Sequence, residues 1–229
     1  MKDALGDRIK NQYEDRTRFM LPRRTYTILR CDGKAFHTLT RGCNKPYDHG
    51  LADAMNRAAT ALCEEAQGSC FAYIQSDEIS VLLQDFATPT TDAWFDGNVQ
   101  KIVSVAAAVV SESFSREFER TAHFDARVFT IADRVEVSNY FIWRQKDAER
   151  NSLSMLCQSH FSHKELQGKG RTAQHEMLHD KNINWDALPT EQKRGRVVEY
   201  MGQWEPNPNI PVFTADRKWL YDRIPEMWP

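Results

Sequence analysis

The sequence of 229 residues lacks any long apolar segment. Its longest apolar run, residues 102–110, is interrupted by Ser104, so no stretch reaches the roughly 18 residues of a membrane-spanning helix. The N-terminus is charged from Lys2 onward and has no apolar core, so we expect no secretion signal. Internal repeats and low-complexity linkers are also missing. These absences predict a globular protein that does not enter a membrane.

Cysteine is scarce, and its pattern forms no recognisable site. The five cysteines are an odd number, and no Cys-x-x-Cys pair occurs. This pattern argues against a disulfide framework and against a cysteine-rich zinc site. A reducing cytoplasm is therefore the compartment that the sequence predicts.

Charge is balanced overall but unevenly distributed. Charged residues make up 27% and aromatic residues 11% of the chain, which disfavours disorder, collagen and coiled coils and suits one large domain. The net charge is −2, yet residues 1–45 carry +6 and residues 46–123 carry −8. A basic N-terminal segment can attract phosphates, although an ordinary solvated surface explains the same charges.

Apolar periodicity predicts an α+β fold. Helical spacing covers residues 5–19, 48–68, 99–114 and 135–160, whereas β-branched and aromatic runs predict strands at 25–31, 71–75, 79–83, 128–131 and 197–200. The polar stretch 162–171 and the proline-rich tail predict irregular structure. The order strand, helix, hairpin, helix, strand predicts an antiparallel sheet with helices on one face.

Carboxylates stand at the ends of two of these predicted strands. Asp32, followed by Gly33, ends the first strand, and Asp77 with Glu78 lies at the tip of the hairpin. If these strands are neighbours in one antiparallel sheet, Asp32 and Asp77 meet at the same place. Adjacent carboxylates repel unless a cation lies between them, and Mg²⁺ held in this way normally also binds substrate phosphates. The alternative is that these are ordinary turn residues.

Several short segments surround these acids in a defined order. They are Arg-Cys-Asp-Gly-Lys-Ala-Phe-His at 30–37, Lys45-Pro46 with Asp48, Tyr-Ile-Gln-Ser-Asp-Glu-Ile-Ser at 73–80, Trp94-Phe95, Phe-Asp-Ala-Arg at 124–127 and Trp-Arg-Gln-Lys-Asp at 143–147. In order and spacing they closely resemble the tRNA-His guanylyltransferase family over roughly residues 5–200.

The resemblance implies a polymerase/cyclase-like palm domain and a two-metal catalytic site. The palm-like catalytic domain would span residues 1–135, and a helical and irregular C-terminal region, residues 136–229, would pack on it as one compact unit. By this likeness Asp32 and Asp77 bind two Mg²⁺ ions, the Gly33 carbonyl is a further ligand, and Glu78 is a further catalytic acid.

The resemblance also implies a nucleotide site for ATP, GTP and other nucleoside triphosphates. Its residues would be Asp32, Gly33, Lys34, Ala35, Phe36, His37, Lys45, Asp48, Ser76 and Asp77. The residue types agree, since lysines supply countercharge to phosphates and His37 can donate a hydrogen bond to a phosphate oxygen.

One segment separates branches of the family. The histidine-tRNA enzymes carry His-Ile-Asn-Asn after the Trp-Arg-Gln segment, whereas residues 148–152 here read Ala-Glu-Arg-Asn-Ser and keep only Asn151. This sequence looks like the guanylyltransferase-like branch, which is associated with template-dependent 3′-to-5′ repair of tRNA 5′ ends after adenylylation. The alternatives are untemplated guanylylation of tRNA-His, a nucleotidyl cyclase, and a catalytically silent RNA-binding module.

The resemblance implies that the partner is tRNA. It also implies a homotetramer, because members of the family form tetramers. Candidate RNA contacts are Arg144, Arg150, Asn151, Lys164, Lys169 and Arg171. Contacts to phosphates and 2′-hydroxyl groups would suffice, because template pairing selects the nucleotide without a side-chain code. A separate His-Glu-x-x-His pattern at residues 175–179 matches a zinc-protease helix, but we interpret it as a surface helix.

Overall fold

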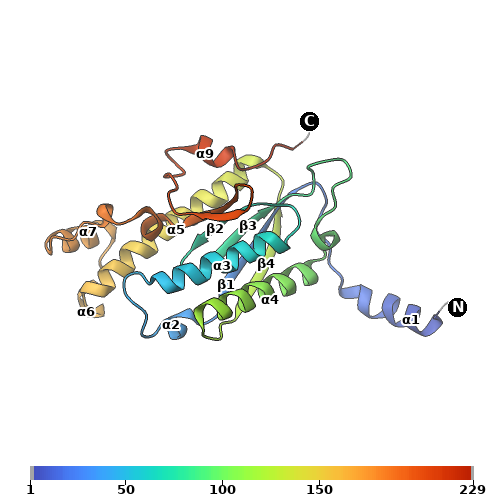
Figure 1. Cartoon of the computed structure of the whole chain (residues 1–229), viewed down its shortest axis with the longest axis horizontal. Coiled ribbons are helices and arrows are strands. Elements are labelled where there is room, and N and C mark those ends of the chain that lie inside the picture. Colours follow the sequence, from blue (N-terminus) through green and yellow to red (C-terminus); the bar gives the residue numbers. More distant parts are fainter. Residues whose placement is uncertain (1–2, 228–229) are drawn as a thin grey trace.

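Six strands form one antiparallel sheet within residues 3–227, the part of the chain that the computed structural model describes (Figure 1). Across the sheet the order is β4-β1-β3-β2-β5-β6. The strands are β1 (Tyr26–Gly33), β2 (Ser69–Gln75), β3 (Glu78–Leu83), β4 (Phe124–Ile131), β5 (Arg196–Tyr200) and β6 (Trp204–Asn207). The predicted strands and hairpin are confirmed, with β4 beginning four residues earlier than expected.

The register places the end of β1 beside the tip of the β2–β3 hairpin. Asp32 lies directly opposite Glu78 in the antiparallel β1–β3 pair. The Gly33 N–H donates a hydrogen bond of 3.1 Å to the Asp77 carbonyl oxygen. The two predicted acidic segments therefore meet at one end of the sheet, as neighbouring strands require.

Helices cover both faces of the sheet (Figure 1), so the prediction of helices on one face is wrong. Alternate β1 residues point to opposite layers: Leu29 and Cys31 join the core beneath two helices, whereas Ile28 joins the core beneath a third. Strand β3 is buried along its whole length, which leaves no solvent-facing side. A central strand that is apolar on both faces needs two covering layers.

The covering helices match the predicted periodicity. One layer contains α3 (His49–Glu65) and α4 (Val99–Phe118), and the other contains the N-terminal half of α5 (Arg134–His160). Asp48 is the N-cap of α3, as the sequence indicated. Helix α5 continues beyond the sheet edge and supports a small outer cluster of helices (Figure 1).

The N-terminal helix is shorter than predicted. Helix α1 (Ala4–Gln12) ends before a 3-10 turn, η1 (Glu14–Thr17), and extends away from the sheet (Figure 1). Its apolar residues remain exposed, with Leu5 60% and Ile9 44% accessible. The periodicity therefore predicted a helix correctly but not its burial.

The C-terminal region completes the sheet and adds short helices. These are α6 (His163–Leu166), α7 (Arg171–His179), α8 (Thr190–Arg194) and α9 (Arg217–Tyr221), with α2 (Phe36–Leu39), η2 (Trp94–Gly97) and η3 (Trp185–Ala187) elsewhere. Sequence reasoning missed α2, α6, α8, α9 and β6. Strand β6 contains Pro206, which fits an edge strand because proline cannot donate to a ladder. Since β5 and β6 belong to the main sheet, the division at residue 135 stays a prediction.

Among the helices of residues 3–227, none has the length and apolar character needed to cross a bilayer.

Candidate active site

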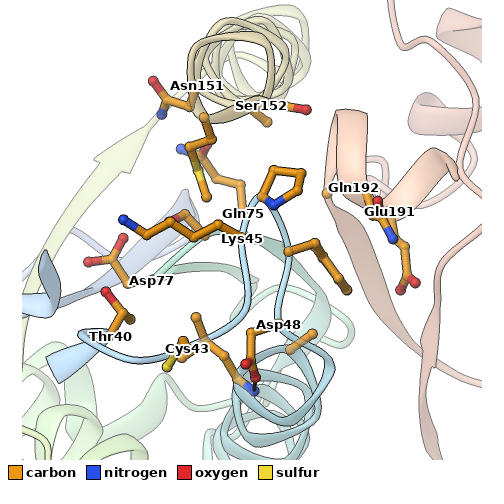
Figure 2. A pocket seen from close by; sticks show the side chains of 18 of the residues that line it. Thr40, Cys43, Lys45, Asp48, Gln75, Asp77, Asn151, Ser152, Glu191 and Gln192 are labelled. Atoms are coloured by element: carbon orange, nitrogen blue, oxygen red, sulfur yellow. Dashed lines mark hydrogen bonds between the residues drawn. The ribbon is translucent and has the colours of Figure 1, made fainter. Parts of the chain in front are cut away.

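A pocket of about 400 Å³ opens at the end of the sheet where β1 stops and β2 turns into β3. Its walls come from the β2–β3 turn, the stretch from α2 to the start of α3 (residues 36–52), the C-terminal half of α5 and the segment around α8 (Figure 2). Four segments far apart in the sequence therefore share one cavity. Its volume suits a small molecule of nucleotide size.

Asp32 and Asp77 are the uncompensated acids of this site. Asp77 lines the pocket, and Asp32 ends the adjoining strand. Burial, together with the negative charges of Asp32 and Glu78, raises the pKa of Asp77. Within residues 3–227 neither aspartate forms an ion pair, whereas Glu78 does. Two hard oxygen donors without an ion-pair partner fit a divalent cation such as Mg²⁺.

The backbone around these acids is unusually constrained. Ser76 in the hairpin turn has φ 49°, and Ala35 has φ 56°, both in the left-handed region that costs energy for residues other than glycine. At Gly33 an added Cβ would lie 2.2 Å from the Phe36 ring. That ring is packed against Phe114, with 5.3 Å between centroids, and has no room to withdraw. The site therefore requires glycine at position 33.

Glu78 is held by a buried arginine rather than left free. Arg144 donates from Nε and Nη2 to the two Glu78 carboxylate oxygens at 2.8 and 2.7 Å. Both side chains are 7% exposed, and the same guanidinium also contacts Asp147. The prediction that Arg144 contacts RNA is corrected, because its guanidinium is enclosed and committed to carboxylates. Glu78 is accordingly placed as a supporting group, with both oxygens already occupied.

The predicted nucleotide residues fall into two sets. Phe36, His37, Lys45, Asp48, Ser76 and Asp77 line the pocket. The others, Asp32, Gly33, Lys34 and Ala35, lie outside the lining residues but continue directly into them along the chain. In Figure 2 the Lys45 side chain extends toward Asp77, which places a cationic group beside the acidic end of the pocket.

Asp48 has a clear local role. Its Oδ1 accepts from the Leu51 N–H and its Oδ2 from the Asn44 N–H, each at 2.9 Å. These hydrogen bonds cap α3 and close the loop that carries Lys45. They also hold the pKa of Asp48 below its ordinary value. Asp48 therefore shapes the pocket wall from which Lys45 projects.

Replacing Asp48 with alanine is expected to lower the free energy of unfolding by about 1 kcal/mol at neutral pH. The pKa of Asp48 in the folded state lies below the unfolded value of roughly 3.9. The stabilisation by its carboxylate is therefore fully present when the pH is above that unfolded value. It is lost as the pH falls through the lower folded-state pKa. Urea unfolding across an acidic pH series measures this, with Asp53→Ala, an exposed acid further along α3, as the control. A difference that persists unchanged in strong acid would contradict the assignment.

Sequence reasoning missed several pocket residues. Gln75, Tyr47, Glu191, Gln192 and Arg196 all line the cavity. Gln75 could have been found, because it directly precedes the acidic turn. The α8 residues carried no signal, since only the fold brings their segment beside the loop 43–48.

The remaining RNA candidates lie on exposed surfaces. Arg150 is exposed and pairs with Asp147, and Asn151 lines the pocket. Lys164, Lys169 and Arg171 are exposed around α6 and α7, at the outer end of α5 (Figure 1). They therefore form a group separate from the pocket lining, and their contact with RNA stays a prediction.

The His-Glu-x-x-His segment lies on α7, away from the pocket lining. His175 packs edge-on against Trp185, with 5.7 Å between ring centroids, and His179 is exposed. Across residues 3–227 no group of three or more His, Cys, Asp or Glu side chains is arranged to hold a metal ion. The acidic site accordingly offers two carboxylates and backbone rather than a closed cage.

Comparison with known proteins points to one family. The sequence model described as tRNAHis guanylyltransferase matches residues 6–132. A probable tRNA(His) guanylyltransferase of Dictyostelium discoideum is 27% identical, with 90% of this chain and 87% of that protein covered.

Two solved structures share the whole architecture. A bacterial tRNA(His) guanylyltransferase-like protein in complex with ATP has a TM-score of 0.93 and 39% identity, covering 96% of this chain and 99% of that one. A second such bacterial protein, in complex with GTP, has a TM-score of 0.82 and 35% identity, covering 97% and 99%.

Proposed function

Because the chain belongs to the tRNA-His guanylyltransferase family of nucleotidyltransferases, we propose that it repairs tRNA 5′ ends by template-dependent 3′-to-5′ nucleotide addition. The observation that carries this proposal is the make-up of the pocket wall. Ala148, Asn151 and Ser152 face the cavity that also contains Lys45 and Asp77. They belong to the α5 segment 148–152, in which the chain departs from the histidine-tRNA enzymes at every position except Asn151.

The reaction has three steps. A 5′-phosphate oxygen of the tRNA attacks the α-phosphorus of ATP, which releases pyrophosphate and leaves a 5′-adenylylated tRNA. The 3′-hydroxyl of the incoming nucleoside triphosphate then attacks the tRNA 5′-phosphorus, forming a phosphodiester, losing its proton and releasing AMP. Water finally removes pyrophosphate from the new 5′ end, leaving a monophosphate.

The residues of the site have different roles in these three steps. Asp32 and Asp77, with the Gly33 carbonyl, are suited to hold two Mg²⁺ ions, which would lower the pKa of the attacking hydroxyl and offset the charge of the leaving group. Lys45 supplies countercharge to phosphates at the pocket end nearest Asp77. Arg144 holds Glu78 in place beside them.

The palm-like assignment rests on the same features. A polymerase-like palm presents acids at the ends of neighbouring antiparallel strands, which is the arrangement of Asp32 on β1 and Asp77 between β2 and β3. The like-protein complexes with ATP and GTP support nucleoside triphosphates as substrates of this chain.

We expect the tRNA to be held through its phosphates and its shape. Exposed Arg150, Lys164, Lys169 and Arg171 provide positive charge outside the pocket, so binding should weaken as salt concentration rises. A homotetramer with RNA lying across subunits stays a prediction from the family.

The proposal is tested with 5′-monophosphorylated tRNA that lacks its first nucleotide. The protein is incubated with ATP, Mg²⁺ and each nucleoside triphosphate in turn, while the opposing template base is varied, and product length is read on a gel. We expect addition of the nucleotide complementary to the template base. Each template base should change which triphosphate is used.

Other outcomes separate the alternatives. Addition of guanosine alone, to tRNA-His alone and whatever base lies opposite, would identify an untemplated guanylyltransferase. Conversion of triphosphate to a cyclic product without RNA would identify a nucleotidyl cyclase. Binding of tRNA with no transfer at all would identify a silent RNA-binding module.

A further inference from the structure

Gln75 presents a buried hydrogen-bond acceptor that no group in the described chain satisfies. The residue is 4% exposed, lines the pocket, and has an Oε1 atom without a partner among residues 3–227. Buried polar side-chain atoms are rarely left without a partner, so an orphan acceptor in a cavity wall points to a ligand. Figure 2 shows Gln75 among the side chains that line the pocket, which also include Lys45.

The amide nitrogen of Gln75 sets the orientation of the whole amide group. Burial alone would raise the pKa of Asp147, yet the pKa is lowered overall. The lowering comes from hydrogen bonds donated by Arg150 and by the Gln75 amide, and from the positive charge of Arg144. A carboxylate can only accept, so the Gln75 nitrogen must face Asp147. Arg144 anchors Asp147 at 2.9 Å, so the carboxylate that faces the Gln75 nitrogen is fixed in place, while the Gln75 oxygen is left without a partner in the described chain.

The ligand group that meets this oxygen must be a hydrogen-bond donor. Bases differ in where their amino groups lie, and template-dependent addition requires all four nucleotides to bind in the same pocket. A protein contact that serves every nucleotide must therefore recognise what the nucleotides share. The shared donors are the ribose hydroxyls, and these lie close to the phosphates for which Lys45 and Asp77 are suited.

We propose that Gln75 Oε1 accepts a hydrogen bond from the ribose 2′-hydroxyl of the bound nucleoside triphosphate and so selects ribonucleotides over 2′-deoxyribonucleotides. The 3′-hydroxyl remains free to act as the nucleophile. The proposal rests on the proposed function, because it takes a nucleoside triphosphate as the occupant of this pocket. Gln75 is thus a specificity-determining residue that acts through the sugar.

The test compares ATP with 2′-deoxyATP, and GTP with 2′-deoxyGTP, by isothermal titration calorimetry in Mg²⁺ without RNA. The wild-type protein should bind each ribonucleotide about tenfold more tightly, the effect of one good hydrogen bond. Gln75→Leu should reduce this ratio to about one by weakening ribonucleotide binding alone. Exposed Gln100→Leu on α4, outside the pocket lining, should leave the ratio unchanged. Rates of addition to truncated tRNA should follow the same ratios.

The outcomes are separable. Equal losses for ribo- and deoxyribonucleotides in Gln75→Leu would overturn the proposal, since Gln75 would then support Lys45 or the fold. A wild-type protein that binds both sugars equally would overturn it as well. If Gln75→Leu does not fold, Gln75→Asn, which retracts the oxygen by one methylene, serves in its place. Sugar selection by a protein that adds nothing to truncated tRNA would support Gln75 and contradict the repair activity.

Discussion

Replacement of Asp77 by asparagine is expected to reduce nucleotidyl transfer by at least about a thousandfold while leaving the fold intact. The carboxylate is half-buried, raised in pKa and lacks an ion-pair partner within residues 3–227. A partly buried carboxylate without an ion-pair partner destabilises the empty protein. This destabilisation is explained if the Asp77 carboxylate binds the metal ion together with the substrate. Asparagine has the same size but removes the charge that a divalent cation requires.

Two measurements check the Asp77 prediction. Addition to truncated tRNA is followed on a gel, and thermal unfolding is recorded with and without Mg²⁺. The melting temperature of Asp77→Asn should equal or exceed that of the wild type without Mg²⁺, because repulsion from Asp32 and Glu78 is relieved. Glu112→Gln, an exposed acid on α4, is the control. Retained transfer with a normal melting curve would refute the metal site.

Loss of the Arg144 guanidinium is expected to have the largest effect on stability. Arg144→Met should lower the free energy of unfolding by about 3–5 kcal/mol, because it leaves Glu78 charged and buried without its bidentate partner, with only Arg30 remaining, at 3.9 Å. Combining it with Glu78→Gln removes the stranded charge. The double variant should therefore be more stable than Arg144→Met alone, by about 2 kcal/mol.

A matched control separates burial from pairing. The exposed pair between Arg116 and Glu112 has the same 2.7 Å separation, but its side chains are 63% and 62% accessible. Arg116→Met should therefore cost at most about 0.5 kcal/mol. Urea unfolding of all variants gives the comparison. A double variant no more stable than Arg144→Met would show that lost packing, and not the unpaired Glu78 charge, explains the destabilisation.

These two experiments assign different roles to neighbouring acids. Asp77 and Glu78 are adjacent in the sequence, and their residue types alone do not distinguish them. The structure does, because α5 delivers Arg144 to Glu78 and delivers no cation to Asp77. The pairing therefore favours Glu78 as a structural anchor, whereas Asp77 lines the pocket without an ion-pair partner among the described residues.

The acidic end of the site was predictable from sequence because local rules govern it. Asp32 ends a strand, Asp77 occupies a two-residue hairpin turn, and antiparallel pairing of nearby strands brings them together. The cap at Asp48 was predictable for the same reason, since helix N-termini favour aspartate. Each of these inferences uses only a few consecutive residues and one pairing rule.

Other features depended on contacts between distant segments. Periodicity predicted α5 within one residue of its start but could not show that Arg144 would be enclosed, because arginine is normally exposed. It likewise could not show that α1 would stand apart with Leu5 exposed, since an amphipathic pattern does not specify a partner.

The sequence by itself therefore determined the order of the first five strands and of the long helices, the acidic turn and the family. These depend on local conformational preference and on motif spacing, both of which are written along the chain. Only the tertiary structure decided that helices cover both faces of the sheet, that Glu78 is neutralised by Arg144, and that the pocket residue Gln75 has a buried oxygen without a partner among the described residues. Burial and pairing depend on which distant side chains meet, and that is settled when the layers pack together.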